Sequence, residues 1–172
     1  MDRFIRSVRL ISRLSGYVAA GLIAIGVLVV CHMVFVRYVL NQNTIWQTDF
    51  VTYSLVAATF IGSPFVLMTR GHVNVDILPT WAGTRMRLRL ALFASIVTLF
   101  FCVVMTVVTF LFFKEALDGR WVSDTMWRAR LWIPYSSMPI GLFILTLQCV
   151  ADLISLLTGR EAPFGLAAGT KP

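Results

Sequence analysis

Four long apolar runs without a charged residue leave this chain few possible folds. They cover residues 14–36, 50–68, 90–113 and 131–151. About 20 apolar residues suffice to cross roughly 30 Å of hydrocarbon. With 58% hydrophobic and 13% charged residues, the chain is too apolar for a water-soluble core inside a polar shell. The sequence predicts an all-α integral membrane protein whose membrane domain covers residues 14–157. Its four transmembrane helices are expected at about 14–38, 49–69, 88–114 and 131–152.

The segments that flank these runs carry most of the positive charge. In residues 1–13 four arginines share one arc of a helix and apolar side chains lie on the other side, which predicts an interfacial amphipathic helix on the inner leaflet. A second interfacial segment is predicted at 80–90, before the third span. The tail at 158–172 is rich in Gly, Ala and Pro and is predicted to be disordered. The first run is too long for a signal peptide and no cleavage site follows it, so we expect an uncleaved anchor.

The distribution of Lys and Arg predicts that both ends of the chain are cytoplasmic. Four arginines precede the first span and four lie between the second and third, but only Arg37 lies between the first and second. The connection after the third span mixes cations with acidic residues, which count little in this rule. Anionic lipid headgroups match the net charge of +7, so no nucleic-acid partner is expected. Aromatic residues then fall at the outer interface (Trp46, Trp121, Trp127, Trp132) and at the inner one (Tyr17, Trp81).

Residue patterns that would support catalysis, cofactor binding or proton-coupled transport are missing. The three cysteines lie inside apolar runs without a CxxC pair, so neither a disulfide nor a metal site is predicted. His32 should lie near the outer face and His72 just past the inner end of the second span, so the two cannot share a haem. No acidic residue lies mid-span, and Asp152 is too shallow for proton exchange. We therefore expect neither an enzyme nor an autonomous exporter.

Prolines and a glycine within the spans have predicted structural roles. Pro64 should kink the second span because it removes one backbone hydrogen bond. Pro134 and Pro139 bracket the first turns of the fourth span, where proline is tolerated, and Gly141 allows close packing.

An ordered set of short motifs runs through the chain. It consists of FVRYVLN at 35–41, W-x-x-D at 46–49, FIGS at 60–63, RGHVNVD at 70–76 and WIPYSSMPIG at 132–141. Their order and spacing, together with the four spans, resemble the small membrane subunit of tripartite ATP-independent periplasmic (TRAP) transporters, the DctQ-like family. The resemblance covers residues 12–157. Two positions depart from the family pattern: Asp49 stands where members often carry Glu, and Pro64 stands where ordinary helix formers are expected.

This resemblance implies a heteromeric importer in the bacterial inner membrane. Such a subunit pairs with a large membrane transport subunit and a soluble periplasmic substrate-binding protein, and the complex imports organic acids, commonly carboxylates, driven by a sodium gradient. The large subunit is expected to hold the substrate and sodium sites, so no cofactor is expected in this chain. The small subunit would brace the large one and help to dock the binding protein. A small-residue face in the first span suits packing on such a partner: Ala19, Gly21, Ala24 and Gly26.

Two sets of residues are candidates for contacts with these partners. Arg37 and Asp49 close the loop between the first and second spans, where they either form an ion pair or anchor separately at the outer interface. The candidate contacts with the large subunit or another partner are Arg37, Trp46, Asp49, Arg70, His72, Asp76, Trp132, Pro134, Pro139 and Gly141. The candidate periplasmic docking segment contains Lys114, Glu115, Asp118, Arg120, Asp124 and Arg128. The alternative function is a redox-complex membrane anchor that binds haem or quinone, supported only by the two histidines and the aromatic content.

Overall fold

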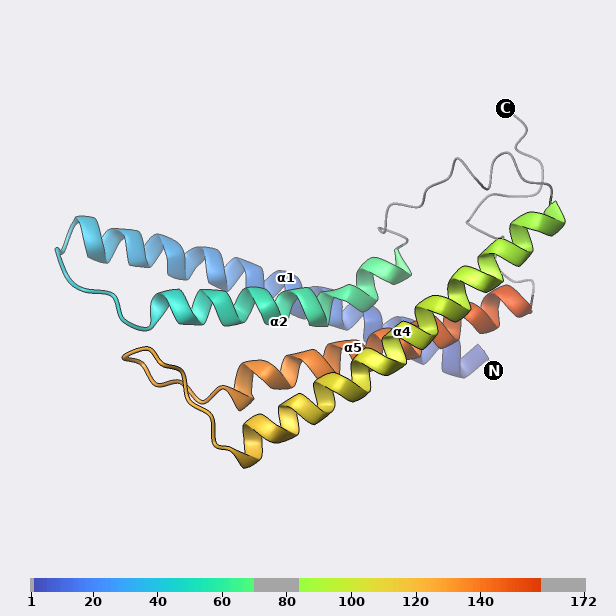
Figure 1. Ribbon diagram of the computed structural model, residues 1–172. Coiled ribbons are helices and arrows are strands. Elements are labelled where there is room, and N and C mark those ends of the chain that lie inside the picture. The colour runs from blue at the N-terminus through green and yellow to red at the C-terminus, as the bar shows by residue number, and fades with distance from the viewer. Residues whose placement is uncertain (1, 70–83, 159–172) are drawn as a thin grey trace.

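Four long helices make up the protein in its computed structural model, which describes residues 2–69 and 84–158. The helices are α1 (Asp2–Tyr38), α2 (Gln47–Met68), α4 (Thr84–Asp118) and α5 (Trp132–Leu157) (Figure 1). Each is long and apolar enough to cross a membrane. The predicted four-span, all-α fold is confirmed, and the described ranges contain no β-strand beyond one isolated bridge between Val122 and Arg130.

The first helix differs from the expectation of a separate interfacial helix. α1 runs without interruption from Asp2 to Tyr38, so the predicted turn between residues 1–13 and the first span is not confirmed. Its N-terminal part presents a buried stripe at alternating spacings of three and four residues, which is one face of a helix. The stripe consists of Ile5, Val8, Ser12, Ser15 and Ala19. The arginines at positions 3, 6, 9 and 13 remain exposed.

The helices pack in the order α1, α2, α5, α4, which differs from their order in the sequence. α1 packs on α2, α2 on α5 and α5 on α4, while α1 also reaches α5. The loop after α1 and the loop after α4 lie at the same end of the molecule, opposite the N-terminus (Figure 1). α2 and α5 both begin at that end and therefore run parallel. The fold thus consists of two helical hairpins joined along α2 and α5.

Small residues bring α1 and α2 together. A Cβ atom on Gly16 would overlap the ring of Phe65, and one on Gly62 would lie 3.0 Å from the Cβ atom of Ala19. Two members of the predicted small-residue face, Ala19 and Gly26, are buried within the chain, whereas Gly21 and Ala24 are exposed. Part of that face therefore serves the contact between α1 and α2.

The contact between α2 and α5 centres on the backbone of Phe60. Pro64 has no N–H for the carbonyl of Phe60, and the hydroxyl of Ser63 donates to that oxygen instead at 2.8 Å. The last turns of α2 leave the line of its first turns (Figure 1), in agreement with the predicted kink. Gly141 packs directly on this carbonyl, because a Cβ atom there would overlap the carbonyl group.

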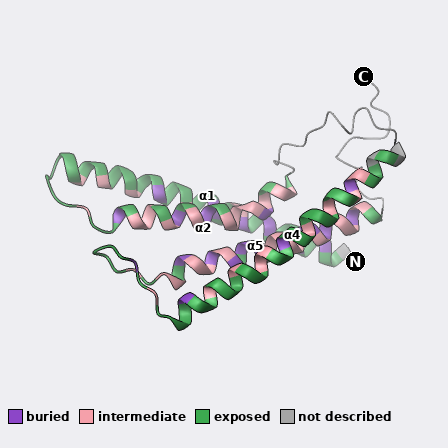
Figure 2. Ribbon diagram, in the orientation of Figure 1, coloured by how far each residue is buried: buried purple, intermediate pink, exposed green. Residues whose placement is uncertain are grey.

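Exposure is distributed unevenly over the bundle. In the most apolar window of α5 33% of residues are buried, but in that of α4 only 6% are. Exposed residues cover much of α1 and α4 (Figure 2). Because α4 packs mainly on one neighbour, it presents most of its apolar surface outward, as lipid or a membrane partner requires.

Candidate functional site

The end of the bundle that carries both interhelical loops holds most of the predicted contact residues. The second loop, 119–131, folds back on itself. Ser123 N–H donates to the carbonyl of Ala129 at 2.9 Å, and Leu131 N–H donates to that of Trp121 at 3.0 Å. Arg128 closes the turn, with its N–H bonded to Thr125 at 3.0 Å and a φ of 49°. We call residues 119–131 the outer hairpin, after the side of the membrane on which the sequence predicts it to lie.

The tip of the outer hairpin contacts the first turn of α2. The hydroxyl of Thr125 donates to Oδ2 of Asp49. Beside it, the rings of Trp46 and Trp127 lie 6.5 Å apart between centroids. Trp46 and Asp49 are the two fixed positions of the W-x-x-D motif, one helical turn apart. The motif therefore joins the two loops of this end into one surface.

Arg37 does not form the ion pair with Asp49 that the sequence left open. Within the described ranges neither side chain has an ion-pair partner. Arg37 instead lines a polar hollow of about 510 Å³ with Tyr38, Asn41 and two further loop amides, from Gln42 and Asn43. Asn41 has a φ of 49°, a conformation that Asn tolerates better than most residues. A guanidinium among amide groups suits an anionic partner group.

The predicted docking segment lies at this same end and faces solvent. Three of its members belong to the last turns of α4 and three to the outer hairpin. Their side chains are exposed: Lys114, Glu115, Asp118, Arg120, Asp124 and Arg128. The segment is thus accessible to a partner protein. Because it contains both basic and acidic side chains, its surface is neither uniformly positive nor uniformly negative.

One buried polar group at this end was not predicted. Gln47 begins α2 and is only 5% exposed. Its Oε1 atom has no hydrogen-bond partner among the described residues. Gln47 is the second residue of the W-x-x-D motif, but nothing in the sequence indicates that its side chain is buried.

A second polar cluster lies toward the opposite end, between α1 and α5. The hydroxyl of Ser12 donates to Oε1 of Gln148 at 2.8 Å, and Nε2 of Gln148 donates to Oδ1 of Asp152 at 2.8 Å. Gln148 is fully buried. The amide thus has both of its polar atoms bonded, which removes most of the cost of placing it in an apolar bundle. Its only signal in the sequence is an amide inside a charge-free run, and this signal does not predict its partners.

The remaining candidates divide into buried, peripheral and undescribed positions. Pro134, Pro139 and Gly141 are buried within the bundle, and Trp132 begins α5 half-buried. A partner role for these four stays a prediction, and Gly141 is already packed against α2. The candidates Arg70, His72 and Asp76 lie outside the described residues.

The sulfur and imidazole groups give no sign of a cofactor site in the described ranges. Cys102 and Cys149 are buried as free thiols with their sulfur atoms 3.9 Å apart, and Cys31 is exposed. No group of three or more possible metal ligands occurs among the residues searched. His32 is exposed on α1. Nothing within 2–69 and 84–158 favours the haem or quinone alternative.

These features define a multi-pass helical membrane protein whose apolar runs contain no charged residue. The family model described as "Tripartite ATP-independent periplasmic transporters, DctQ component" matches residues 26–159. The chain belongs to this family, which confirms the resemblance of its motifs and makes it a transporter component rather than an enzyme.

A curated relative supports the same assignment. The chain is similar to the C4-dicarboxylate TRAP transporter small permease protein DctQ of Vibrio cholerae serotype O1, with 23% identity over 148 residues. The similarity covers 74% of this chain and 64% of the length of that relative. No solved structure matches the chain.

Proposed function

We propose that this chain is the small permease subunit of a sodium-coupled, binding-protein-dependent TRAP importer. The observation that carries the proposal is the family match over residues 26–159, which includes the whole of α2, α4 and α5. The cargo would be an organic acid anion, and the name of the Vibrio cholerae relative points to C4-dicarboxylates. The substrate and sodium sites would belong to the large membrane subunit.

Bracing that large subunit is the role that suits the helices. None of the four apolar runs contains an acidic residue, and proton-coupled transport needs such a group within the membrane. The exposed apolar surface of α4 and α1 is instead suited to packing on another membrane chain. We infer that the chain contributes a fixed wall to the complex.

The end that carries the outer hairpin would face the periplasm and help to dock the binding protein. Two features support this assignment: the Arg37 hollow offers a cation to an anionic group, and the docking segment is exposed. The exposed arginines near the N-terminus lie at the opposite end, which agrees with cytoplasmic termini in the inner membrane.

Uptake by reconstituted vesicles tests this proposal. Vesicles should accumulate labelled C4-dicarboxylate only when this chain, the large membrane subunit and the binding protein are all present with an inward sodium gradient. Replacing sodium by potassium should abolish uptake. Uptake catalysed by this chain alone would disprove the bracing role, and a large subunit that transports equally well without it would do the same.

Arg37→Ala and Asp49→Ala test the docking role separately from membrane insertion. Both variants should insert and co-purify normally but should need more binding protein for half-maximal uptake. Arg6→Ala is the control, because Arg6 is also an exposed charged residue but lies near the N-terminus, at the opposite end of the bundle. An unchanged dependence on binding protein in both test variants would contradict the docking role.

A further inference from the structure

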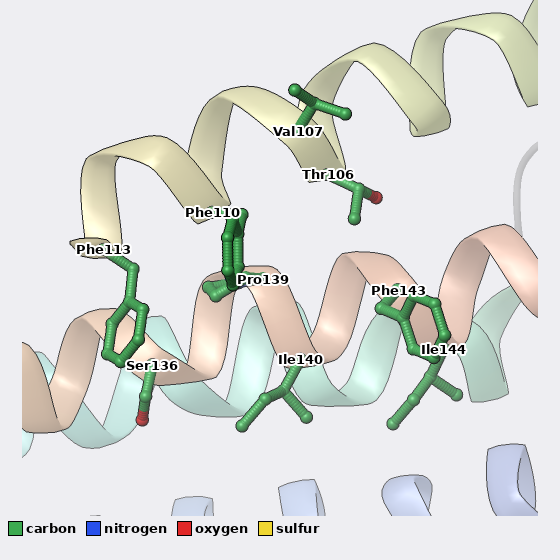
Figure 3. Close-up of a pocket in the computed structure, with 9 residues that line it drawn as sticks. All are labelled: Thr106, Val107, Phe110, Phe113, Ser136, Pro139, Ile140, Phe143 and Ile144. Atoms are coloured by element: carbon green, nitrogen blue, oxygen red, sulfur yellow. The ribbon is translucent and has the colours of Figure 1, made fainter.

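A groove of about 480 Å³ runs along the seam between α4 and α5, in the half of the bundle next to the outer hairpin. One wall comes from α4, with Thr106, Phe110 and Phe113, and the other from α5, with Ser136 and Ile140 (Figure 3). The proposed bracing and docking roles assign nothing to this groove.

The polar groups in the groove are bonded within their own helices or across the seam. The hydroxyl of Thr106 donates to the carbonyl of Cys102 at 2.7 Å and lies 3.1 Å from the hydroxyl of Thr146. Ser136 donates to the carbonyl of Ile133 at 2.7 Å. Because both hydroxyl protons in the groove are already donated and the remaining lining residues are apolar, a molecule that fills it should be mainly hydrocarbon there.

The dimensions of the groove select among apolar occupants. Thr106 and Phe113 are seven residues apart, so the groove is roughly 10 Å long at about 1.5 Å per residue. A volume of about 480 Å³ then corresponds to a cross-section of roughly 45 Å². A helix with side chains is about 10–12 Å wide and needs roughly 80–110 Å². A whole helix therefore cannot lie inside the groove, whereas a single hydrocarbon chain can.

A cation lies at the end of the groove next to the outer hairpin, and an aromatic cluster outside the groove lies at the same level along α4. Lys114 shares a helical face with the groove residues Val107 and Phe110, at spacings of seven and four. It is exposed and has no ion-pair partner within the described ranges. At the same level the ring of Phe112 lies 5.7 Å from that of Trp121 and 5.1 Å from that of Tyr135. Trp and Tyr prefer the headgroup level of a bilayer.

We propose that the groove between α4 and α5 binds one acyl chain of a phospholipid from the leaflet on the hairpin side, and that Lys114 holds its phosphate. An acyl chain gains little by leaving lipid for an apolar groove, so close packing and the attraction between lysine and phosphate supply the preference. The bound acyl chain would fill the open part of the seam between α4 and α5. Further along, the seam is closed where the thiols of Cys102 and Cys149 meet.

Photolabelling tests this site in the intact complex. The chain is purified with its membrane partner and placed in vesicles of phosphatidylethanolamine and phosphatidylglycerol. A trace of the phosphatidylglycerol carries a diazirine in one acyl chain. After irradiation, peptide mass spectrometry should find more label on Phe110 and Ile140 than on Phe93 and Phe100, which are at least as exposed but lie outside the groove.

Variants then separate binding from general contact with lipid. Lys114→Gln should lower the labelling of the groove about fivefold, the effect of one cation near a phosphate. Ser136→Phe, and independently Ile140→Trp, should remove the excess label by filling the groove. Val97→Phe is the control, because Val97 is 50% exposed on α4 and does not line the groove.

Three results would overturn the proposal. The first is label on the groove no higher than on Phe93 and Phe100. The second is labelling that neither filling variant reduces. The third is a photoreactive residue at position 140 that cross-links to the large subunit instead of to lipid.

Discussion

Gly141 and Phe60 show how single residues set the distance between α2 and α5. The helices approach until the backbone of α5 lies on a carbonyl group of α2, and only glycine leaves room for this. The same carbonyl lacks its helical donor because Pro64 follows four residues later, and Ser63 supplies the replacement. A packing contact and a hydrogen bond therefore depend on the same peptide group.

Gly141→Ala should destabilise the chain because its methyl group would overlap the carbonyl of Phe60. Forcing the helices apart should cost on the order of 1–3 kcal/mol. The matched control is Gly21→Ala, since no atom lies within 4 Å of a Cβ atom there. Thermal unfolding in detergent should show a lower midpoint for Gly141→Ala and an equal or higher one for Gly21→Ala. Equal midpoints would contradict the close contact.

Ser63→Ala should also destabilise the bundle, because it leaves the carbonyl of Phe60 without a donor. Leaving this part-buried carbonyl unsatisfied should cost about 1 kcal/mol, the low end of the range for a buried group. Thr59→Val is the control: its hydroxyl donates to the carbonyl of Leu55 at 2.8 Å, and that carbonyl keeps its helical donor. The same unfolding measurement should show a larger loss of stability for Ser63→Ala than for Thr59→Val. Equal losses would show that the hydroxyl of Ser63 does not compensate for the missing N–H of Pro64.

Residue roles that depend on local chemistry could be predicted from the sequence, and those that depend on distant partners could not. Pro64 was expected to kink its helix and Gly141 to permit close packing, since both effects follow from the residue type. The bond between Ser12 and Gln148 joins positions 136 residues apart. The partner of Asp49, Thr125, is 76 residues away. Such pairings depend on the packing order of the helices, which no local pattern specifies.

The outer hairpin is fixed to the first turn of α2 by side-chain contacts. The hairpin alone has a few backbone bonds and no core, so the hydrogen bond to Asp49 and the contact between Trp46 and Trp127 hold it against the bundle. The first turn of α2 also favours a carboxylate at position 49, because a helix N-terminus carries partial positive charge.

Thr125→Val and Asp49→Asn should each loosen the hairpin, and the double variant should add little to either. For residues in direct contact we expect a coupling of about 0.5–3 kcal/mol. Amide hydrogen exchange in residues 119–131 measures the loosening. Asp124→Asn is the control, because this neighbouring carboxylate is exposed and has no hydrogen-bond or ion-pair partner within the described ranges. Additive effects of the two changes would show that the bond does not hold the hairpin.

At the scale of the whole molecule, the two loops at one end and the arginines at the other predict a fixed orientation. In a chain without its three native cysteines, Met126→Cys should react with an impermeant maleimide added to the periplasmic side of intact spheroplasts. Met126 is 87% exposed at the tip of the outer hairpin. Arg6→Cys should react only after the membrane is permeabilised. The reverse pattern would contradict cytoplasmic termini.

The packing order α1, α2, α5, α4 has a consequence for how the chain enters the membrane during synthesis. α2 and α5 are each synthesised directly after a helix on which they pack, so a packing partner is already in the membrane when they enter it. α1 and α4 enter the membrane without a packing partner. α1 is the first helix in the chain, and α4 packs mainly on α5, which has not yet been synthesised. These two spans contain the most apolar windows of the four, and α2 contains the least apolar one. The helices that must enter lipid alone are those whose own composition best allows it.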